Sequence, residues 1–180
     1  MKKISTQQLV RIALMAAVLC ILGPISFPLA ISAVPVSLSI LGIFLTLVIL
    51  NPFEATIAIL IYIALGLVGM PVFSNYTGGV SKLFGPTGGY IIGYIPLALI
   101  AWFFIKKFNR KLPFMCAGLV IGTAACYLLG TAWLAISAGM SFKAALFAGV
   151  IPFIPWDIAK LVISILVGLP VRRSIVRFME

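Results

Sequence analysis

The sequence has 180 residues, of which 63% are hydrophobic and only 9% are charged, and its mean hydropathy is +1.27. A water-soluble domain carries roughly 25% charged residues, so this chain has too few charges to cover a globule in water and we expect lipid to surround it. The net charge of +10 comes from 13 basic and 3 acidic residues; because the basic residues flank apolar runs, they indicate membrane topology and not nucleic-acid binding.

The residue inventory excludes most catalytic chemistry. The chain has no histidine, and its acids are Glu54, Asp157 and Glu180. Metal-dependent hydrolysis, carboxylate pairs and Ser-His-Asp catalysis therefore lack their components. No P-loop motif is present, and the three cysteines lie inside apolar runs without metal-ligand spacing. We expect a protein that is not an enzyme and that has no metal or cofactor.

Six apolar runs approach the length of about 20 residues that crosses a bilayer. They cover residues 7–24, 36–51, 52–68, 88–106, 113–136 and 156–176. Only Asn51-Pro52 separates the second run from the third, and proline favours the start of a helix. The sequence thus predicts an all-α integral membrane protein of six transmembrane helices, with a tight hairpin at Asn51-Pro52 and one domain over residues 1–180.

The basic residues predict the orientation of these helices. With six spans both termini share one side, and that side carries ten lysines and arginines against two, Lys82 and Lys143, on the other. Positive residues accumulate in cytoplasmic segments, so both termini are expected in the cytoplasm of a bacterial or archaeal cell. The ten are Lys2, Lys3, Arg11, Lys106, Lys107, Arg110, Lys111, Arg172, Arg173 and Arg177.

The connections predicted on the outer side are long, over residues 25–35, 69–87 and 137–155. Long loops in a compact domain are usually functional or disordered, and apolar and aromatic residues argue against disorder here. Within the third connection, Ser141 to Ile151 is apolar but too short to span, which predicts an interfacial or re-entrant helix. Pro155 is then expected to open the last span.

Small residues lie four apart at Ala13 and Ala17 in the first span. Such spacing lets another helix approach closely, either within this chain or from a partner.

The connection from Phe73 to Tyr90 is rich in glycine and in hydrogen-bonding side chains. Glycine allows the backbone to approach a ligand, and polar groups beside aromatic faces are typical of small-molecule sites. The segment therefore predicts either a ligand cap or an ordinary outer turn. The candidate ligand contacts are Asn75, Tyr76, Thr77, Lys82, Gly88 and Tyr90.

Asp157 and Lys160 lie three residues apart and thus share one face in the first turns of the last span. Charges at membrane depth are costly and usually functional. The pair is either a ligand clamp or a structural ion pair. Tyr127, Trp133 and Trp156, near the outer ends of spans, form an interfacial aromatic belt or line a pocket.

The segment Leu83-Phe-Gly-Pro-Thr-Gly-Gly-Tyr90, followed by Ile-Ile-Gly-Tyr94, closely resembles the signature of the BioY family. Four further pieces match in order and spacing: Val34-Pro-Val-Ser-Leu38, Gly69-Met-Pro-Val-Phe73, Gly130-Thr-Ala-Trp-Leu134 and Pro155-Trp-Asp-Ile-Ala-Lys160. Members of this family are biotin-binding S components of energy-coupling factor (ECF) transporters.

This resemblance implies the ECF S-component fold, with biotin held beneath the outer loops. It implies Asp157 and Lys160 as polar ligands, and it implies that Ala13 and Ala17 face a transmembrane coupling subunit. Two cytoplasmic ATPases would act with that subunit and hydrolyse ATP. Ser39, a further candidate contact, stands where the family often has glutamine, and residues 74–77 are less rich in glycine than is frequent in the family.

An apolar pocket with an acid, a base and neutral donors suits biotin, which combines an apolar bicycle, a ureido group and an anionic tail. Asp157 could accept from a ureido N–H while Lys160 or Lys82 neutralises the carboxylate, and the residues leave open which end of biotin meets which side chain. The alternatives are an S component for another vitamin, a membrane-embedded enzyme and a purely structural membrane subunit.

Overall fold

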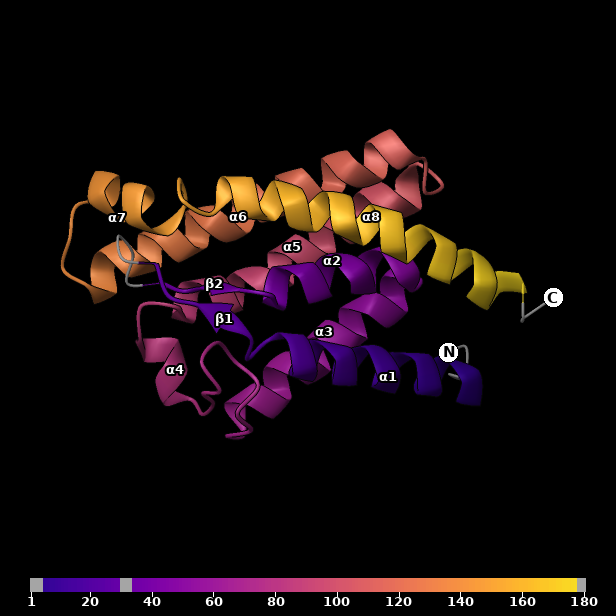
Figure 1. The fold of residues 1–180 in the computed structure, drawn as a ribbon, viewed down its shortest axis with the longest axis horizontal. Helices are drawn as coiled ribbons and strands as arrows, with labels where there is room; N and C mark the ends of the chain where they lie inside the picture. The colour runs from indigo at the N-terminus through magenta and orange to yellow at the C-terminus, as the bar shows by residue number, and fades with distance from the viewer. Residues whose placement is uncertain (1–4, 30–33, 178–180) are drawn as a thin grey trace.

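The computed structural model describes residues 5–29 and 34–177 as an elongated bundle of helices (Figure 1). A short antiparallel pair of strands joins the first two helices, with Ser26 opposite Ser37 and Phe27 opposite Val36. In chain order the elements are α1 Thr6–Leu22, β1 Ser26–Phe27, β2 Val36–Ser37, α2 Ser39–Ile49, α3 Pro52–Leu67, α4 Ser81–Phe84, α5 Gly88–Lys107, α6 Leu112–Ser137, α7 Phe142–Gly149 and α8 Ile154–Arg177.

Three of these helices, α5, α6 and α8, are long and apolar enough to cross a membrane. The apolar helices α1, α2 and α3 are shorter, with 17, 11 and 16 residues. The predicted second span was too long at its start, because residues 36 and 37 form β2. The backbone N–H of Leu38 still donates to Ile25 O at 2.9 Å, which keeps the chain in the hairpin until α2 begins at Ser39.

Two local predictions of secondary structure are confirmed. α3 begins at Pro52, one residue after the extended Asn51, so the turn between α2 and α3 is tight. A short helix, α7, occupies the apolar segment after Ser141, whose side chain caps it by accepting from the Ala144 N–H at 3.2 Å. The strands and α4 were not expected.

The two ends of the bundle differ in construction. The start of α1, the α2–α3 turn, the α5–α6 turn and the end of α8 lie together at one end, here called the turn end (Figure 1). The strands, α4 and α7 lie at the opposite end, here called the loop end (Figure 1). The long connections are therefore gathered where α5 and α8 begin.

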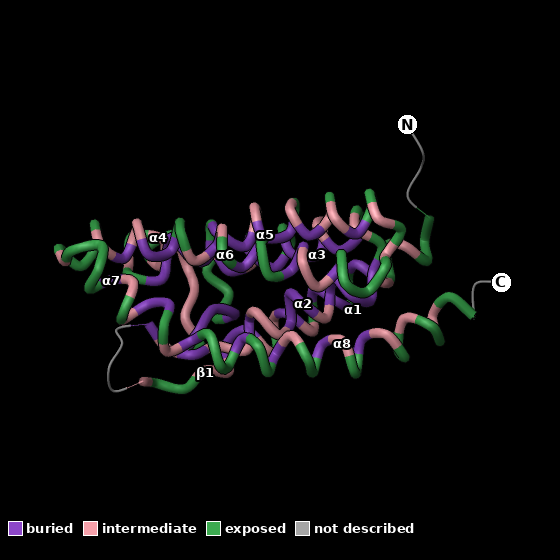
Figure 2. The backbone as a smooth tube through the Cα atoms, turned by 90° about the horizontal axis from the view of Figure 1, so that it is seen from above, coloured by how far each residue is buried: buried purple, intermediate pink, exposed green. Residues whose placement is uncertain are grey.

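α8 buries charged residues and exposes apolar ones, which is the reverse of a helix in a water-soluble protein. Its buried residues are Asp157, Lys160, Ser164 and Gly168, spaced three or four apart on one face. The rest of its length is largely exposed (Figure 2). Most of these exposed residues are apolar. A charged inward stripe with an apolar outward surface is typical of a helix surrounded by lipid.

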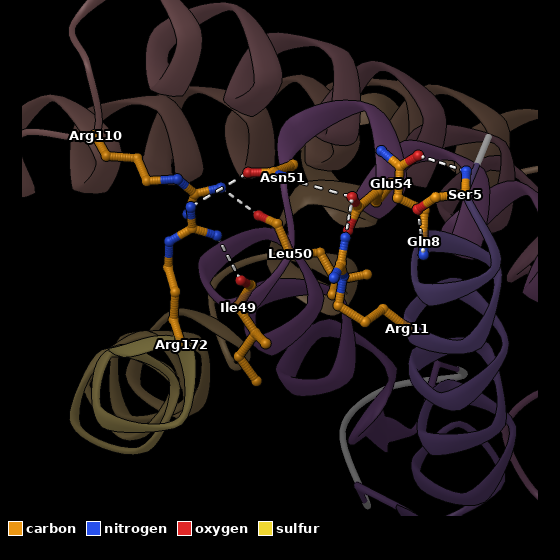
Figure 3. A network of polar contacts seen from close by, with 9 residues as sticks. All are labelled: Ser5, Gln8, Arg11, Ile49, Leu50, Asn51, Glu54, Arg110 and Arg172. Atoms are coloured by element: carbon orange, nitrogen blue, oxygen red, sulfur yellow. Dashed lines mark hydrogen bonds and ion pairs between the residues drawn. The ribbon is translucent and has the colours of Figure 1, made fainter. Parts of the chain in front are cut away.

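At the turn end, two arginines satisfy the C-terminal carbonyls of α2 (Figure 3). Arg110, in the α5–α6 turn, donates to Val48 O at 2.8 Å and to Leu50 O. Arg172, from α8, donates to Ile49 O at 2.7 Å. Since the last carbonyls of a helix have no partner within it, these contacts tie α2 to α5, α6 and α8.

The same network continues to α1 (Figure 3). Glu54, at the start of α3, pairs with Arg11 of α1 at 2.8 Å and accepts from the Asn51 side chain at 3.4 Å. Asn51 also accepts from Arg172 at 3.2 Å. Burial, together with the nearby Arg172, lowers the pKa of Arg110, which nevertheless stays protonated at neutral pH. The turn end is thus firmly cross-linked.

Candidate ligand-binding site

The charged residues of α8 form a buried ion pair at the loop end. Lys160 Nζ lies 2.7 Å from Asp157 Oδ1, and the two residues are only 5% and 6% exposed. The spacing of three residues on one helix brings them together, as the sequence predicted. Because burial removes both charges from bulk water, further hydrogen bonds are needed to compensate for the lost hydration.

Two other elements supply those bonds. Tyr127 of α6 donates its hydroxyl to Asp157 Oδ2 at 2.6 Å. Lys160 donates to the backbone oxygen of Ser37 in β2 at 2.7 Å. An ammonium has three N–H donors, and two of those on Lys160 are used among the described residues. One donor therefore remains for a ligand.

The pair borders one of two adjacent cavities of about 40 Å³ each. Residues of β2 and of the first turns of α5 line both cavities, and the first turns of α8 line the cavity beside the ion pair. These segments lie at the loop end (Figure 1). The two cavities share the lining residues Val34, Pro35, Ser37, Tyr90 and Tyr94. Ile40, Tyr127, Gly149, Phe153, Asp157 and Lys160 complete the first, and Ser39, Tyr62, Phe73, Ser74, Thr87 and Ile91 complete the second.

Tyr90 and Ser39 lie where a ligand in these cavities would touch them. Tyr90 lines both cavities and donates its hydroxyl to Gly149 O at 2.8 Å, which joins α5 to α7. Ser39 lines the second cavity, with its hydroxyl 2.7 Å from that of Ser37 and 3.2 Å from that of Tyr62. The structure thus gathers four of the candidate contacts, Asp157, Lys160, Tyr90 and Ser39, around one continuous region.

Thr87 is a further candidate ligand contact, which the sequence did not reveal. Its hydroxyl is buried in the wall of the second cavity and has no hydrogen-bond partner among the described residues. An unpaired buried hydroxyl costs free energy unless something else satisfies it. The neighbouring loop is held in place because Trp133 of α6 donates to Gly85 O at 3.0 Å. Thr87 is thus available to a ligand.

The stretch Asn75 to Thr77 faces away from both cavities. Asn75 and Tyr76 have positive φ values of 61° and 53°, and Tyr76 is 70% exposed. Asn75 exchanges two hydrogen bonds with Ser26, at 2.7 and 2.9 Å, which ties the loop to β1. Thr77 donates its hydroxyl to Ser74 O at 2.8 Å. None of the three lines a described cavity, so a contact with ligand stays a prediction for each.

Lys82 and Gly88 also lie outside the cavity walls. Burial lowers the pKa of Lys82, which is half-buried in α4. Gly88 starts α5, and a Cβ there would fall 1.8 Å from Leu83 O. Gly88 is therefore explained by close packing of α4 on α5, and the sequence could not separate that role from a ligand contact.

Of the remaining residues singled out in the sequence, Ala13, Ala17 and Trp156 lie on the surface, and Tyr127 lies in the wall of the cavity beside the ion pair. Ala13 and Ala17 are exposed on α1, so they do not pack within the described part of this chain. Trp156 is exposed at the start of α8, whereas Tyr127 belongs to the ion-pair network.

Within residues 5–29 and 34–177 no group of three potential metal ligands occurs. The chemistry gathered here is recognition by an acid, a base, hydroxyls and aromatic rings.

These features define a helical membrane protein with a buried ion pair and two small cavities at one end of its bundle. The chain belongs to the BioY family, whose model matches residues 1–177.

Two relatives match nearly end to end. The biotin transporter BioY2 of Lactococcus lactis subsp. cremoris is 33% identical over 176 residues, which cover 97% of this chain and 95% of the relative. The biotin transporter BioY of Thermotoga maritima is 32% identical over 167 residues, or 93% and 96% of the two chains. A crystal structure described as the S component for biotin from an ECF-type ABC transporter matches with a TM-score of 0.85 and 26% identity, over 93% of this chain and 91% of that one.

Proposed function

We propose that this chain is the biotin-binding S component of an ECF-type transporter and captures biotin for uptake across the cytoplasmic membrane. The observation that carries the proposal is the buried Asp157–Lys160 pair beside the loop-end cavities, in a chain that matches the BioY family over its whole described length. The protein would have no catalytic role and no cofactor of its own.

The chemistry of the cavity walls suits the parts of biotin. Asp157 can accept from the ureido N–H groups, and the third donor of Lys160 can meet a carboxylate or the ureido oxygen. Thr87 and Ser39 offer hydroxyls, while Phe73, Tyr90 and Tyr94 supply aromatic surface for the bicycle. Either end of biotin can meet the ion pair, so the direction of the ligand stays open.

Biotin binding would require the loop end to open. Pockets for ligands of drug size have volumes of roughly 300–1,000 Å³, and each cavity here has about 40 Å³. The connection over residues 69–87 is the part that would move. It contributes Phe73, Ser74 and Thr87 to the wall of the second cavity, and the other described loop residues in that wall lie at 34–37. The turn end is cross-linked by arginines and would stay fixed.

In the proposed arrangement all six apolar helices, α1, α2, α3, α5, α6 and α8, cross or enter the bilayer. Both termini lie in the cytoplasm. The asymmetry of ten basic residues against two supports this orientation, as does the position of the α1 start and the α8 end together at the turn end (Figure 1). The loop end would face the outside, where the vitamin arrives.

Ala13 and Ala17 would contact the transmembrane coupling subunit, and two cytoplasmic ATPases would act through that subunit. Their exposure on α1 supports this role, because small exposed residues four apart let a second helix approach closely.

The direct test is to identify the ligand. Protein purified in detergent without added vitamin is denatured, the released small molecules are identified by mass spectrometry, and emptied protein is titrated calorimetrically with biotin, thiamine and riboflavin. The proposal predicts release of biotin and a binding isotherm with biotin alone. Binding of another vitamin without biotin would assign the chain to that vitamin instead.

A further inference from the structure

The exposed face of α5 near the turn end combines apolar surface with positive charge. Leu99, Trp102, Phe103 and Lys106 follow helical spacing and share a face, and Lys107 lies beside them. Leu99 is 43% and Phe103 55% exposed. Together the five residues line a shallow surface hollow of about 630 Å³, here called the α5 hollow.

The two ammonium groups lie against aromatic rings. Lys106 Nζ is 5.6 Å from the centre of the Trp102 ring, and Lys107 Nζ is 5.1 Å from that of Phe103 and 5.7 Å from that of Phe108. Helical side chains lean toward the N-terminus, so both lysines reach back over the rings of the preceding turn. Phe108 is in turn stacked on Phe114 of α6 at 4.0 Å, which supports the ring beneath Lys107.

The positive charge of the α5 hollow has no acidic partner in the described part of the chain. The acids described there are Glu54 and Asp157, and they are paired with Arg11 and Lys160. The C-terminus of α5 supplies about half a negative charge, which leaves most of the two positive charges uncompensated. Lys106 and Lys107 are therefore placed to attract an anion from the surroundings of the helix.

We propose that the α5 hollow binds an anionic glycerophospholipid. The phosphate would lie between Lys106 and Lys107, where it gains charge-assisted hydrogen bonds, and an acyl chain would follow Trp102, Phe103 and Leu99 toward the bilayer centre. Aromatic residues at headgroup depth and basic residues at a helix end are the two features that such a lipid recognises. This site is separate from the loop-end cavities and does not depend on the ligand held there.

The experiment uses native mass spectrometry. Wild-type protein is released from vesicles of equal parts phosphatidylglycerol and phosphatidylcholine with matched acyl chains, and the retained lipids are counted by class. We expect a preference for phosphatidylglycerol in the wild type, lowered about tenfold or more in K106Q/K107Q and kept in K106R/K107R, which preserves both charges.

R173Q/R177Q is the matched control, because it removes two exposed positive charges from the same end of the molecule without touching the α5 hollow. It should retain the preference. An equal loss in this control would show diffuse attraction without a site, and a wild type without preference would likewise overturn the proposal. All variants are first checked for monodispersity, and their unchanged biotin titration would separate this result from any defect at the loop end.

Discussion

The carboxylate of Asp157 accepts from Lys160 on its own helix and from Tyr127 on α6. Because both oxygens are used and both charges are buried, the pair is ordered before any ligand arrives. That order would limit the entropy lost on binding, which is how preorganised sites gain affinity.

Asp157→Asn keeps the shape of the side chain and one acceptor but removes the charge. We expect biotin affinity to fall by roughly ten- to a hundredfold, since a charge-assisted hydrogen bond contributes about 1.5–3 kcal/mol. Lys160→Met should have a similar effect through loss of the free donor. Calorimetric titration of monodisperse protein measures both changes. Wild-type affinity in both variants would make the pair purely structural.

Thr87→Val removes the unpaired hydroxyl and nearly preserves the volume of the side chain. If the hydroxyl meets biotin, affinity should fall roughly two- to tenfold, because a neutral hydrogen bond contributes about 0.5–1.5 kcal/mol. The melting temperature should not fall, because no bond within the described protein is lost. Thr46→Val is the control, since the Thr46 hydroxyl is buried but donates to Gly42 O within α2. If both variants bind biotin equally well, Thr87 does not contact the ligand.

Among the elements, α1 presents Ala13 and Ala17 on an exposed face. Tryptophan at both positions should block docking of the coupling subunit by filling the space that a second helix needs. Biotin binding should stay intact, because neither residue lies near the loop-end cavities. Co-purification of the complex, measured beside biotin titration, tests this. Survival of the complex with both tryptophans would place the interface elsewhere.

The sequence predicted the long helices well because hydrophobic length and flanking charge are local properties. It missed β1 and β2, since two-residue strands have no periodicity and exist only because Ser26 and Ser37 meet after the chain folds. Helical spacing was enough to pair Asp157 with Lys160, whereas the bond from Tyr127 spans 30 residues and left no local trace.

For the glycine-rich segment, composition indicated a region that borders the cavities but did not show which of its side chains line them. The described walls contain Phe73, Ser74 and Thr87, while Asn75 and Tyr76 turn outward on left-handed backbone. Which residues of a loop face inward depends on its dihedral angles, and these follow from contacts such as Asn75 with Ser26 that no sequence pattern marks.

For the whole molecule, the proposed orientation places the turn end in the cytoplasm and the loop end outside. In a background without the native cysteines, Val80→Cys should react with an impermeant thiol reagent in intact cells, and Lys111→Cys should react only after the membrane is opened. Both positions are exposed. The reverse labelling pattern would invert the topology.

The inward stripe of α8 bears on how the protein is assembled during synthesis. Burying an ion pair in a membrane helix is costly unless further hydrogen bonds satisfy it, and the partners of this pair beyond α8, Tyr127 and Ser37, lie in segments made earlier. A nascent α8 therefore meets a face that can already supply the hydrogen bonds that its ion pair needs. In a translocon assay, residues 150–177 alone should insert less efficiently than the same residues behind the rest of the chain, and replacing Asp157 and Lys160 with leucine should abolish that difference. Equal insertion of both unsubstituted forms would mean that α8 enters the membrane without help from the helices it later binds.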